Sequence, residues 1–168
     1  MTPPNSLAVT VVMPAYNAVG VVERGIESLL AQEDPPAAYE IIVVDDASQD
    51  TTAEVVEGYI ETAAAQGITL RLIRQSPNAG PARARNRGAA EASGEILIFT
   101  DSDCELTPRW LAEMLAPFAD PKISAVKGAY LSRQPELGAR FAQAEFEERY
   151  RMLEAAETVD VVFSYSAA

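Results

Sequence analysis

Two aspartates one residue apart, Asp101 and Asp103, are the residues whose types and spacing most directly suggest chemistry. They follow the apolar run ILIFT at 96–100, which is typical of a buried strand. Because side chains alternate along a strand, both carboxylates can project to the same side where the chain leaves it. The pair would repel, and a cation that prefers oxygen ligands and phosphate, Mg²⁺ or Mn²⁺, would offset the repulsion. We therefore predict a metal–diphosphate site, with a solvated turn as the alternative.

The composition is that of an ordinary globular domain and limits the partners. The chain has 168 residues, of which 48% are hydrophobic and 23% are charged. It carries 13 Lys and Arg against 25 Asp and Glu, so its formal net charge is −12. This charge argues against nucleic acid or an anionic membrane as the main partner. An anionic ligand is still compatible with it where a bound cation supplies positive charge.

The sequence has a single cysteine, Cys104, and no histidine. One cysteine forms no internal disulfide, which fits a cytoplasmic location, and we expect Cys104 to be a packing residue. Without histidine, Ser–His and Cys–His catalysis are excluded, so acid–base work falls to carboxylates, tyrosine or lysine. We find no signal-peptide pattern and no apolar run of membrane-spanning length. Membrane attachment of a longer parent protein is left open.

Strand-like and helix-like segments alternate along the chain. We expect strands at 7–13, 39–44, 68–73, 95–100, 123–130 and 159–165, and helices at 21–32, 51–63, 82–92, 107–118 and 135–155. Thr51 to Glu54 form a capping-box pattern, and Thr107 is a cap followed by Pro108 at the first helical position. This alternation predicts an α/β fold with a mainly parallel sheet and helices on both faces.

Polar and aromatic residues gather where the expected strands end, which is where open α/β sheets bind ligands. Such strand ends carry Pro14, Ala15, Tyr16 and Asn17, then Asp45 and Asp46, then Asp101, Ser102 and Asp103. Tyr16 offers a flat face for stacking on a base, and Asp46 can accept a hydrogen bond from a base or a ribose. Since successive strand residues point to opposite faces, we expect one of Asp45 and Asp46 to face the ligand and the other to cap a loop.

An arginine-bearing segment, NAGPARARNRG at 78–88, begins an expected helix in this otherwise acidic chain. A helix N-terminus with an arginine nearby suits phosphate, although Arg83, Arg85 and Arg87 cannot all share one face. The segment is neither a Walker loop nor a GxGxxG loop.

The chain resembles the family 2 glycosyltransferases, the large inverting group with the GT-A fold, in the ordered segments VTVVMPAYNA, EIIVVDDASQDTT, NAGPARARNRG, ASGEILIFTDSDC and TPRWLAEM. The resemblance implies a nucleotide-sugar-binding region at 8–130, preceded by a disordered tail at 1–7. Residues 131–168 would begin a truncated acceptor-side region. The implied reaction moves a sugar from a nucleoside-diphosphate sugar of the UDP type to an acceptor hydroxyl, with inversion and with Mn²⁺ or Mg²⁺.

The resemblance also implies individual roles. Tyr16 looks like a nucleoside contact, Asp46 like the base contact and Arg85 like the arginine near the nucleotide. The segment from Asp101 to Asp103 looks like the DXD motif, with Asp103 as the metal ligand and Asp101 nearer the sugar nucleotide. The predicted nucleotide-sugar contacts are Pro14, Ala15, Tyr16, Asn17, Asp46, Gly80, Arg85, Asp101 and Ser102, and the predicted metal ligands are Asp103 and Asp101.

The general base is the part that the resemblance does not supply. In this family it lies in an acidic motif beyond the acceptor region, and these residues contain no such motif; Glu145, Glu147 and Glu148 are expected at a helix surface. We therefore expect a fragment that binds donor but transfers sugar negligibly. Its acceptor, a saccharide or a lipid-linked molecule, is not identified. An uncovered apolar face over 135–165 predicts self-association or disorder near the C-terminus.

Other classes of protein share part of this pattern. A nucleotide-sugar-binding protein without turnover would have the same pocket and is the main alternative. A sugar-phosphate nucleotidyltransferase would need a glycine-rich basic loop after the first strand, which PAYNAVG lacks. A haloacid dehalogenase-type phosphatase would carry its Asp-x-Asp pair after the first strand, and a response-regulator receiver fits the Asp-Ser-Asp spacing poorly.

Overall fold

The structure, a computed structural model, describes residues 9–35, 37–129, 140, 143–145, 147–148 and 151. It divides the chain into two compact units, Met1–Ala116 and Pro117–Ala168, and each is described by itself. The expected tail at 1–7, the expected strand at 159–165 and part of the expected helix at 135–155 lie outside the described residues. The predicted functional division near residue 130 stays a prediction.

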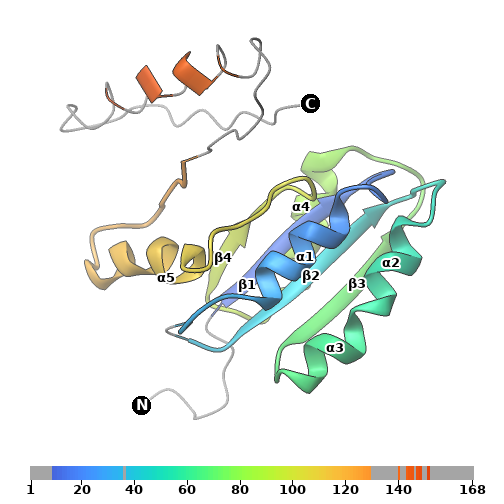
Figure 1. Ribbon diagram of the computed structural model, residues 1–168, viewed down its shortest axis with the longest axis horizontal. Coiled ribbons are helices and arrows are strands. Elements are labelled where there is room, and N and C mark those ends of the chain that lie inside the picture. The colour runs from blue at the N-terminus through green and yellow to red at the C-terminus, as the bar shows by residue number, and fades with distance from the viewer. Residues whose placement is uncertain are drawn as a thin grey trace. The chain divides into compact units, whose positions relative to one another are not determined.

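A parallel sheet of four strands forms the centre of the first unit (Figure 1). In spatial order the strands are β3 (Thr69–Gln75), β2 (Tyr39–Asp46), β1 (Val9–Ala15) and β4 (Ile96–Phe99). Every neighbouring pair is parallel. The strand order therefore reverses between β1 and β4, and ligands of such sheets bind beyond the carboxyl ends at this point.

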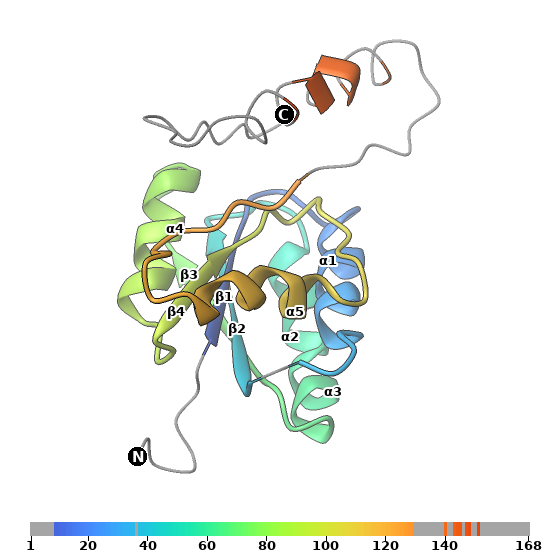
Figure 2. The ribbon, with the colours of Figure 1, turned by 90° about the vertical axis from the view of Figure 1, so that its left-hand side faces the viewer.

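Helices cover both faces of the sheet, as predicted (Figure 2). One face carries α4 (Pro81–Ala90), and the other carries α1 (Val22–Leu30), α2 (Thr52–Gly58) and α3 (Ile60–Ala65). Two further helical segments follow β4, namely α5 (Trp110–Leu115) and the 3₁₀ turn η1 (Ala116–Ala119). The predicted α/β fold is confirmed.

Alternation along the central strands supplies two apolar cores. Val11 and Ile41 pack in the core on the side of α1, whereas Val12 and Ile42 pack with Ala84 of α4. Both faces of β1 and β2 are buried, which explains their nearly continuous apolar sequences.

The expected strand at 123–130 is not formed. Residues 123–129 have no regular secondary structure and are mostly exposed, and Tyr130 lies outside the described residues. A strand needs a neighbour that accepts and donates its backbone hydrogen bonds, and alternating apolar residues do not provide one. The prediction of a strand from the apolar pattern of this segment is therefore wrong.

Two predicted helix caps are also wrong. Thr51 precedes α2 but makes no capping hydrogen bond through its side chain. Helix α5 begins at Trp110 rather than at Pro108, and its start is instead held by Gln32, whose Oε1 accepts from Leu111 N–H at 2.7 Å. A contact with the segment that follows α1 thus replaces the local cap that the sequence suggested.

A buried polar cluster fastens the amino-terminal edge of the sheet. Glu40, which is 1% exposed, accepts hydrogen bonds from Thr10 Oγ1 at 2.8 Å and from Ser93 N–H at 2.7 Å. Its other oxygen lies 3.7 Å from Arg71 Nη1. Gly94 N–H donates to Thr10 Oγ1, and a Cβ on Gly94 would lie 2.5 Å from the Val9 carbonyl carbon. The cluster therefore ties the segment before β4 to β1 and β2.

The second unit contributes helical residues at 140, 143–145, 147–148 and 151, within the helix expected at 135–155. Glu145, Glu147 and Glu148 are exposed there, as predicted. None of the helices in the described ranges combines the length and apolar content that crossing a membrane requires.

Candidate functional site

The segment after β1 exposes Tyr16 and is held by Asn17. Tyr16 is 47% exposed at the carboxyl edge of the sheet. Asn17 has a φ of +47°, a left-handed conformation that asparagine tolerates. Its backbone N–H donates to Ser48 Oγ at 2.9 Å, and its Oδ1 accepts from Gln49 N–H at 2.8 Å. The predicted ligand-binding role of Asn17 stays a prediction, and in this structure its side chain joins the loops after β1 and β2.

A second group of hydrogen bonds joins the same two loops. Ala18 N–H donates to Thr52 Oγ1 at 2.8 Å, and Val19 N–H donates to Asp50 Oδ2 at 3.3 Å. Asp50 Oδ1 also accepts from Thr52, from both its N–H and its hydroxyl. These hydrogen bonds, the one from the Thr52 hydroxyl above all, hold the pKa of Asp50 below its ordinary value. Asp50 was not among the predicted site residues, although an aspartate just before a helix is a common capping residue.

Both acids at the end of β2 hold loops. The buried carboxylate of Asp46 accepts from Ala79 N–H at 2.8 Å and Gly80 N–H at 2.7 Å, and also from the Gln75 side chain. Asp45 Oδ2 accepts from Ser48 N–H at 3.4 Å. The loop-holding role that we expected for one of the two acids is thus filled by both.

Asp45 retains an unused acceptor at this edge. Its Oδ1 is buried and, within the described part of the chain, accepts no hydrogen bond. A buried carboxylate oxygen normally has a donor, so this atom is suited to an N–H or O–H group from outside these residues.

The two aspartates after β4 lie together, as their spacing predicted. Ligand atoms of Asp101, Asp103 and Cys104 all lie within 4.8 Å of one another. Arg85 of α4 forms an ion pair with Asp101 through its Nη2. A hydrogen bond from Cys104 N–H to the Asp101 carbonyl, at 3.1 Å, closes the turn between them. The guanidinium offsets part of the repulsion between the two carboxylates.

Cys104 is a poor nucleophile in this setting. Burial raises the pKa of its thiol, and the carboxylates of Asp103 and Asp101 raise it further. Since the thiolate is the reactive form, a raised pKa fits a packing residue.

Strand order brings these groups to one edge. β1 lies between β2 and β4, and it continues for three residues beyond its last pairing with β4, that of Val12 with Phe99. Pro14 and Ala15 lie inside β1 and are buried, whereas Tyr16 and Asn17, which follow the strand, are exposed. Ser102 and Gly80 are partly exposed within their loops.

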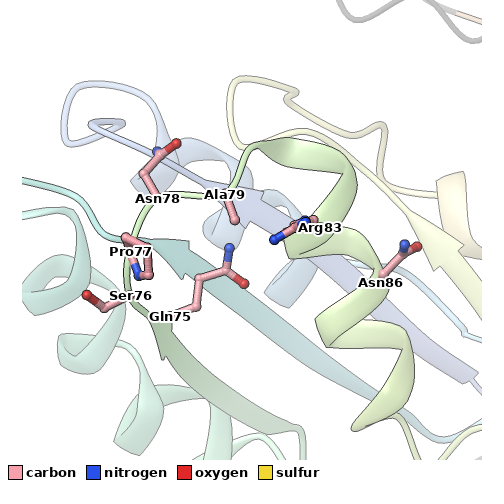
Figure 3. A pocket seen from close by; sticks show the side chains of 7 residues that line it. All are labelled: Gln75, Ser76, Pro77, Asn78, Ala79, Arg83 and Asn86. Atoms are coloured by element: carbon pink, nitrogen blue, oxygen red, sulfur yellow. The ribbon is translucent and has the colours of Figure 1, made fainter.

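A hollow of about 410 Å³ lies beside the loop that Asp46 holds (Figure 3). Its lining comes from the end of β3, the following segment and α4, namely Gln75, Ser76, Pro77, Asn78, Ala79, Arg83 and Asn86. Among the described residues Arg83 has no carboxylate partner, whereas Arg85 pairs with Asp101 and Arg87 with Glu91. The sequence placed three arginines near this helix start, and the structure assigns Arg83 alone to the hollow.

Comparison with known families matches residues 10–166 to Glycosyl transferase family 2. Glycosyltransferase AglE of Haloferax volcanii is 29% identical over 120 residues, which cover 71% of this chain and 38% of AglE. The chain thus spans well under half the length of that curated relative.

Solved structures give the same result. S. aureus TarS 1-349 in complex with UDP-GlcNAc matches with a TM-score of 0.60 and 28% identity, covering 76% of this chain and 37% of that one. The mannosyltransferase PcManGT from Pyrobaculum calidifontis, in complex with GDP-Man and Mn²⁺, matches with a TM-score of 0.64 and 32% identity. That match covers 75% of this chain and 37% of PcManGT.

Proposed function

Because this chain belongs to the family 2 glycosyl transferases, we propose that it binds a nucleoside-diphosphate sugar at the carboxyl edge of β1, β2 and β4. It would supply the donor side of an enzyme that transfers the sugar to an acceptor hydroxyl with inversion. The membership sets aside the phosphatase and receiver alternatives. UDP-GlcNAc and GDP-Man are bound by solved relatives, and both belong to this class of donor.

The observation that carries the proposal is the position of the Asp101–Asp103 pair. Two carboxylates lie together at the end of β4, where the strand order reverses. Tyr16 is exposed at the end of the neighbouring strand β1. An acidic group for a cation and an aromatic face for a base at one sheet edge match the two ends of a nucleoside diphosphate.

The residues at this edge fit a divalent cation. Asp101 and Asp103 offer hard carboxylate oxygens, the ligands that Mg²⁺ and Mn²⁺ prefer. Asp103 is exposed, so its carboxylate is accessible to a cation from solution. When bound, such a cation would stabilise the negative charge that develops on the leaving diphosphate. The thiol of Cys104 is a soft donor and adds little to the binding of either ion.

Transfer itself would form a bond between the acceptor oxygen and the anomeric carbon while the bond from that carbon to the diphosphate breaks. Inversion requires the acceptor to attack from the face opposite the leaving group. The acceptor proton goes to a base, for which we assign no residue. The described side chains would bind the donor. Tyr16 would stack on the nucleobase, and Arg85 and the two aspartates would hold the diphosphate and its cation.

The first prediction concerns removal of the metal. UDP should bind more tightly with Mn²⁺ or Mg²⁺ than with EDTA, because the cation neutralises charge between the diphosphate and the two aspartates. Isothermal titration calorimetry with UDP and with GDP, each in both conditions, measures this and ranks the two bases. If each nucleotide binds with the same affinity in Mn²⁺ or Mg²⁺ as in EDTA, the proposed cation site is contradicted.

The second prediction concerns Arg83. Arg83→Ala should weaken nucleotide binding by about fivefold, because it removes from the hollow beside the Asp46 loop a cation that has no carboxylate partner in the described part of the chain. Arg87→Ala is the matched control, since it removes the same charge from the same helix, outside the lining of the hollow. Titration of UDP into both variants compares them. Equal losses would mean that Arg83 acts only through net charge.

A measurement of sugar transfer distinguishes a transferase from a protein that only binds the nucleotide sugar. Incubation with UDP-GlcNAc or GDP-Man and candidate saccharide or lipid-linked acceptors, followed by mass spectrometry, detects transfer directly. Binding without any transfer, in the full-length protein as well, would favour the nucleotide-sugar-binding protein that the sequence left open.

A further inference from the structure

The turn that carries the two aspartates packs against a glycine of α1. Gly25 is buried in that helix. A Cβ built on it would lie 3.3 Å from the Ser102 carbonyl oxygen and 3.4 Å from the Cys104 carbonyl oxygen. The third neighbour, Met13 Cε at 3.1 Å, ends a flexible side chain that can move away, whereas the two carbonyls belong to the turn itself. The backbone between Asp101 and Cys104 can thus approach α1 because position 25 has no side chain.

One turn further along α1, a serine holds the chain that leaves this turn. Ser28 Oγ accepts a hydrogen bond from Leu106 N–H at 3.0 Å and donates to the Gly25 carbonyl at 2.8 Å. The contact fixes the chain two residues after Cys104.

The segment that follows α1 continues the attachment. Gln32 Nε2 donates to the Thr107 carbonyl at 2.9 Å, and Glu33 N–H donates to the Pro108 carbonyl at 2.7 Å. Helix α1 and the residues that follow it therefore hold the segment after β4 from the aspartates to the start of α5.

We propose that Gly25 and Ser28 are positioning residues for the divalent cation, because they set the backbone of the turn that presents Asp101 and Asp103. Neither residue belongs to the acidic cluster. Glycine inside a helix is less favourable than alanine, so the helix by itself would gain from a methyl group at position 25. The packing of the turn opposes that gain. The inference rests on the proposed metal-dependent donor binding.

The effect should appear in metal affinity rather than in folding. A methyl group at position 25 would push the Ser102 carbonyl by a few tenths of an ångström and would touch the Cys104 carbonyl. The shift at Ser102, between the two aspartates, would change the separation of the carboxylates. Residues that orient metal ligands without touching the metal typically contribute about 10–100-fold to metal affinity. We expect Gly25→Ala and Ser28→Ala each to weaken Mn²⁺ binding by about tenfold, while UDP affinity in EDTA is unchanged.

Two matched variants serve as controls. Gly58→Ala places the same methyl group at another helical glycine, where a Cβ would meet no atom within 4 Å. It should leave Mn²⁺ affinity unchanged. Ser28→Thr keeps the hydroxyl that accepts from Leu106 N–H and should restore most of the affinity that Ser28→Ala loses.

Mn²⁺ titrations followed by calorimetry, together with hydrogen–deuterium exchange of the Cys104 and Leu106 amides, complete the test. Faster exchange at these amides in Gly25→Ala and Ser28→Ala, with weaker Mn²⁺ binding and an intact fold, would support the inference. Wild-type Mn²⁺ affinity in both variants would overturn it. If the wild-type protein itself shows no Mn²⁺ effect, the proposed metal dependence fails. Hydrogen–deuterium exchange of the Cys104 and Leu106 amides then tests separately whether Gly25 and Ser28 position the turn. Exchange at the wild-type rate in both variants would overturn that role as well.

Discussion

Asp103→Asn should abolish the part of nucleotide binding that depends on metal while leaving the fold intact. Asp103 is exposed and lies with Asp101 in one cluster, so its carboxylate is available to a cation. Even residues outside the ligand shell contribute about 10–100-fold to metal affinity, so losing a ligand should cost at least about 100-fold. Calorimetry with UDP, with and without Mn²⁺, measures the loss.

The fold should not suffer from this substitution. Removing one of two neighbouring negative charges relieves repulsion, so thermal stability without metal should stay the same or rise slightly. Glu105→Gln makes the same change of charge two residues further on and should keep the metal effect. If Glu105→Gln loses the metal effect on UDP binding as Asp103→Asn does, the effect depends on net charge and not on Asp103 as a metal ligand.

Asp46→Ala should weaken nucleotide binding in a way that does not depend on metal. Asp46 holds the backbone N–H groups of Ala79 and Gly80, so its removal should release the loop beside the hollow. Nucleotide binding should therefore weaken equally with metal and with EDTA. Identical responses of the Asp46 and Asp103 variants to metal would contradict the division of roles between the two strand ends.

Glu40→Ala should destabilise the protein by about 3 kcal/mol, because it leaves the buried Thr10 hydroxyl and the Ser93 N–H without their acceptor. Ser93 N–H and the Thr10 hydroxyl both donate to Glu40, which is 1% exposed, and Arg71 loses one of its two ion pairs while keeping that with Glu91. Urea unfolding followed by circular dichroism, with the fluorescence of Trp110 as a second probe, measures the shift of the midpoint.

Two variants bracket this prediction. Glu40→Gln keeps an acceptor oxygen of the same shape and should lose less stability than Glu40→Ala. Glu54→Ala removes a glutamate from an exposed ion pair with Arg74 and should change stability by less than about 1 kcal/mol. Equal losses in Glu40→Ala and Glu54→Ala would show that burial of the cluster contributes little.

The four strands of the sheet and the placement of the acids at their ends could be predicted from local sequence patterns. β1 and β2 are apolar on both faces because they are buried on both faces, and this pattern is readable without a structure. The spacing of Asp101 and Asp103 places both on one side of a strand end, and their proximity is a local property of the backbone. Local periodicity is a reliable guide where burial repeats along one element.

Which groups hold which loops could not be predicted in this way, because it depends on contacts between distant segments. Asp46 binds backbone N–H groups more than thirty residues away, and the Gln32 side chain, rather than the Thr107 hydroxyl, accepts from Leu111 N–H in the first turn of α5. The expected strand at 123–130 failed for the same reason, since pairing depends on a neighbour that lies elsewhere in the sequence. Gly25 carries no chemical signal in the sequence, because its role is the space that it leaves for another segment. Such contacts join residues that are distant along the chain, and only the packing of the elements brings them together.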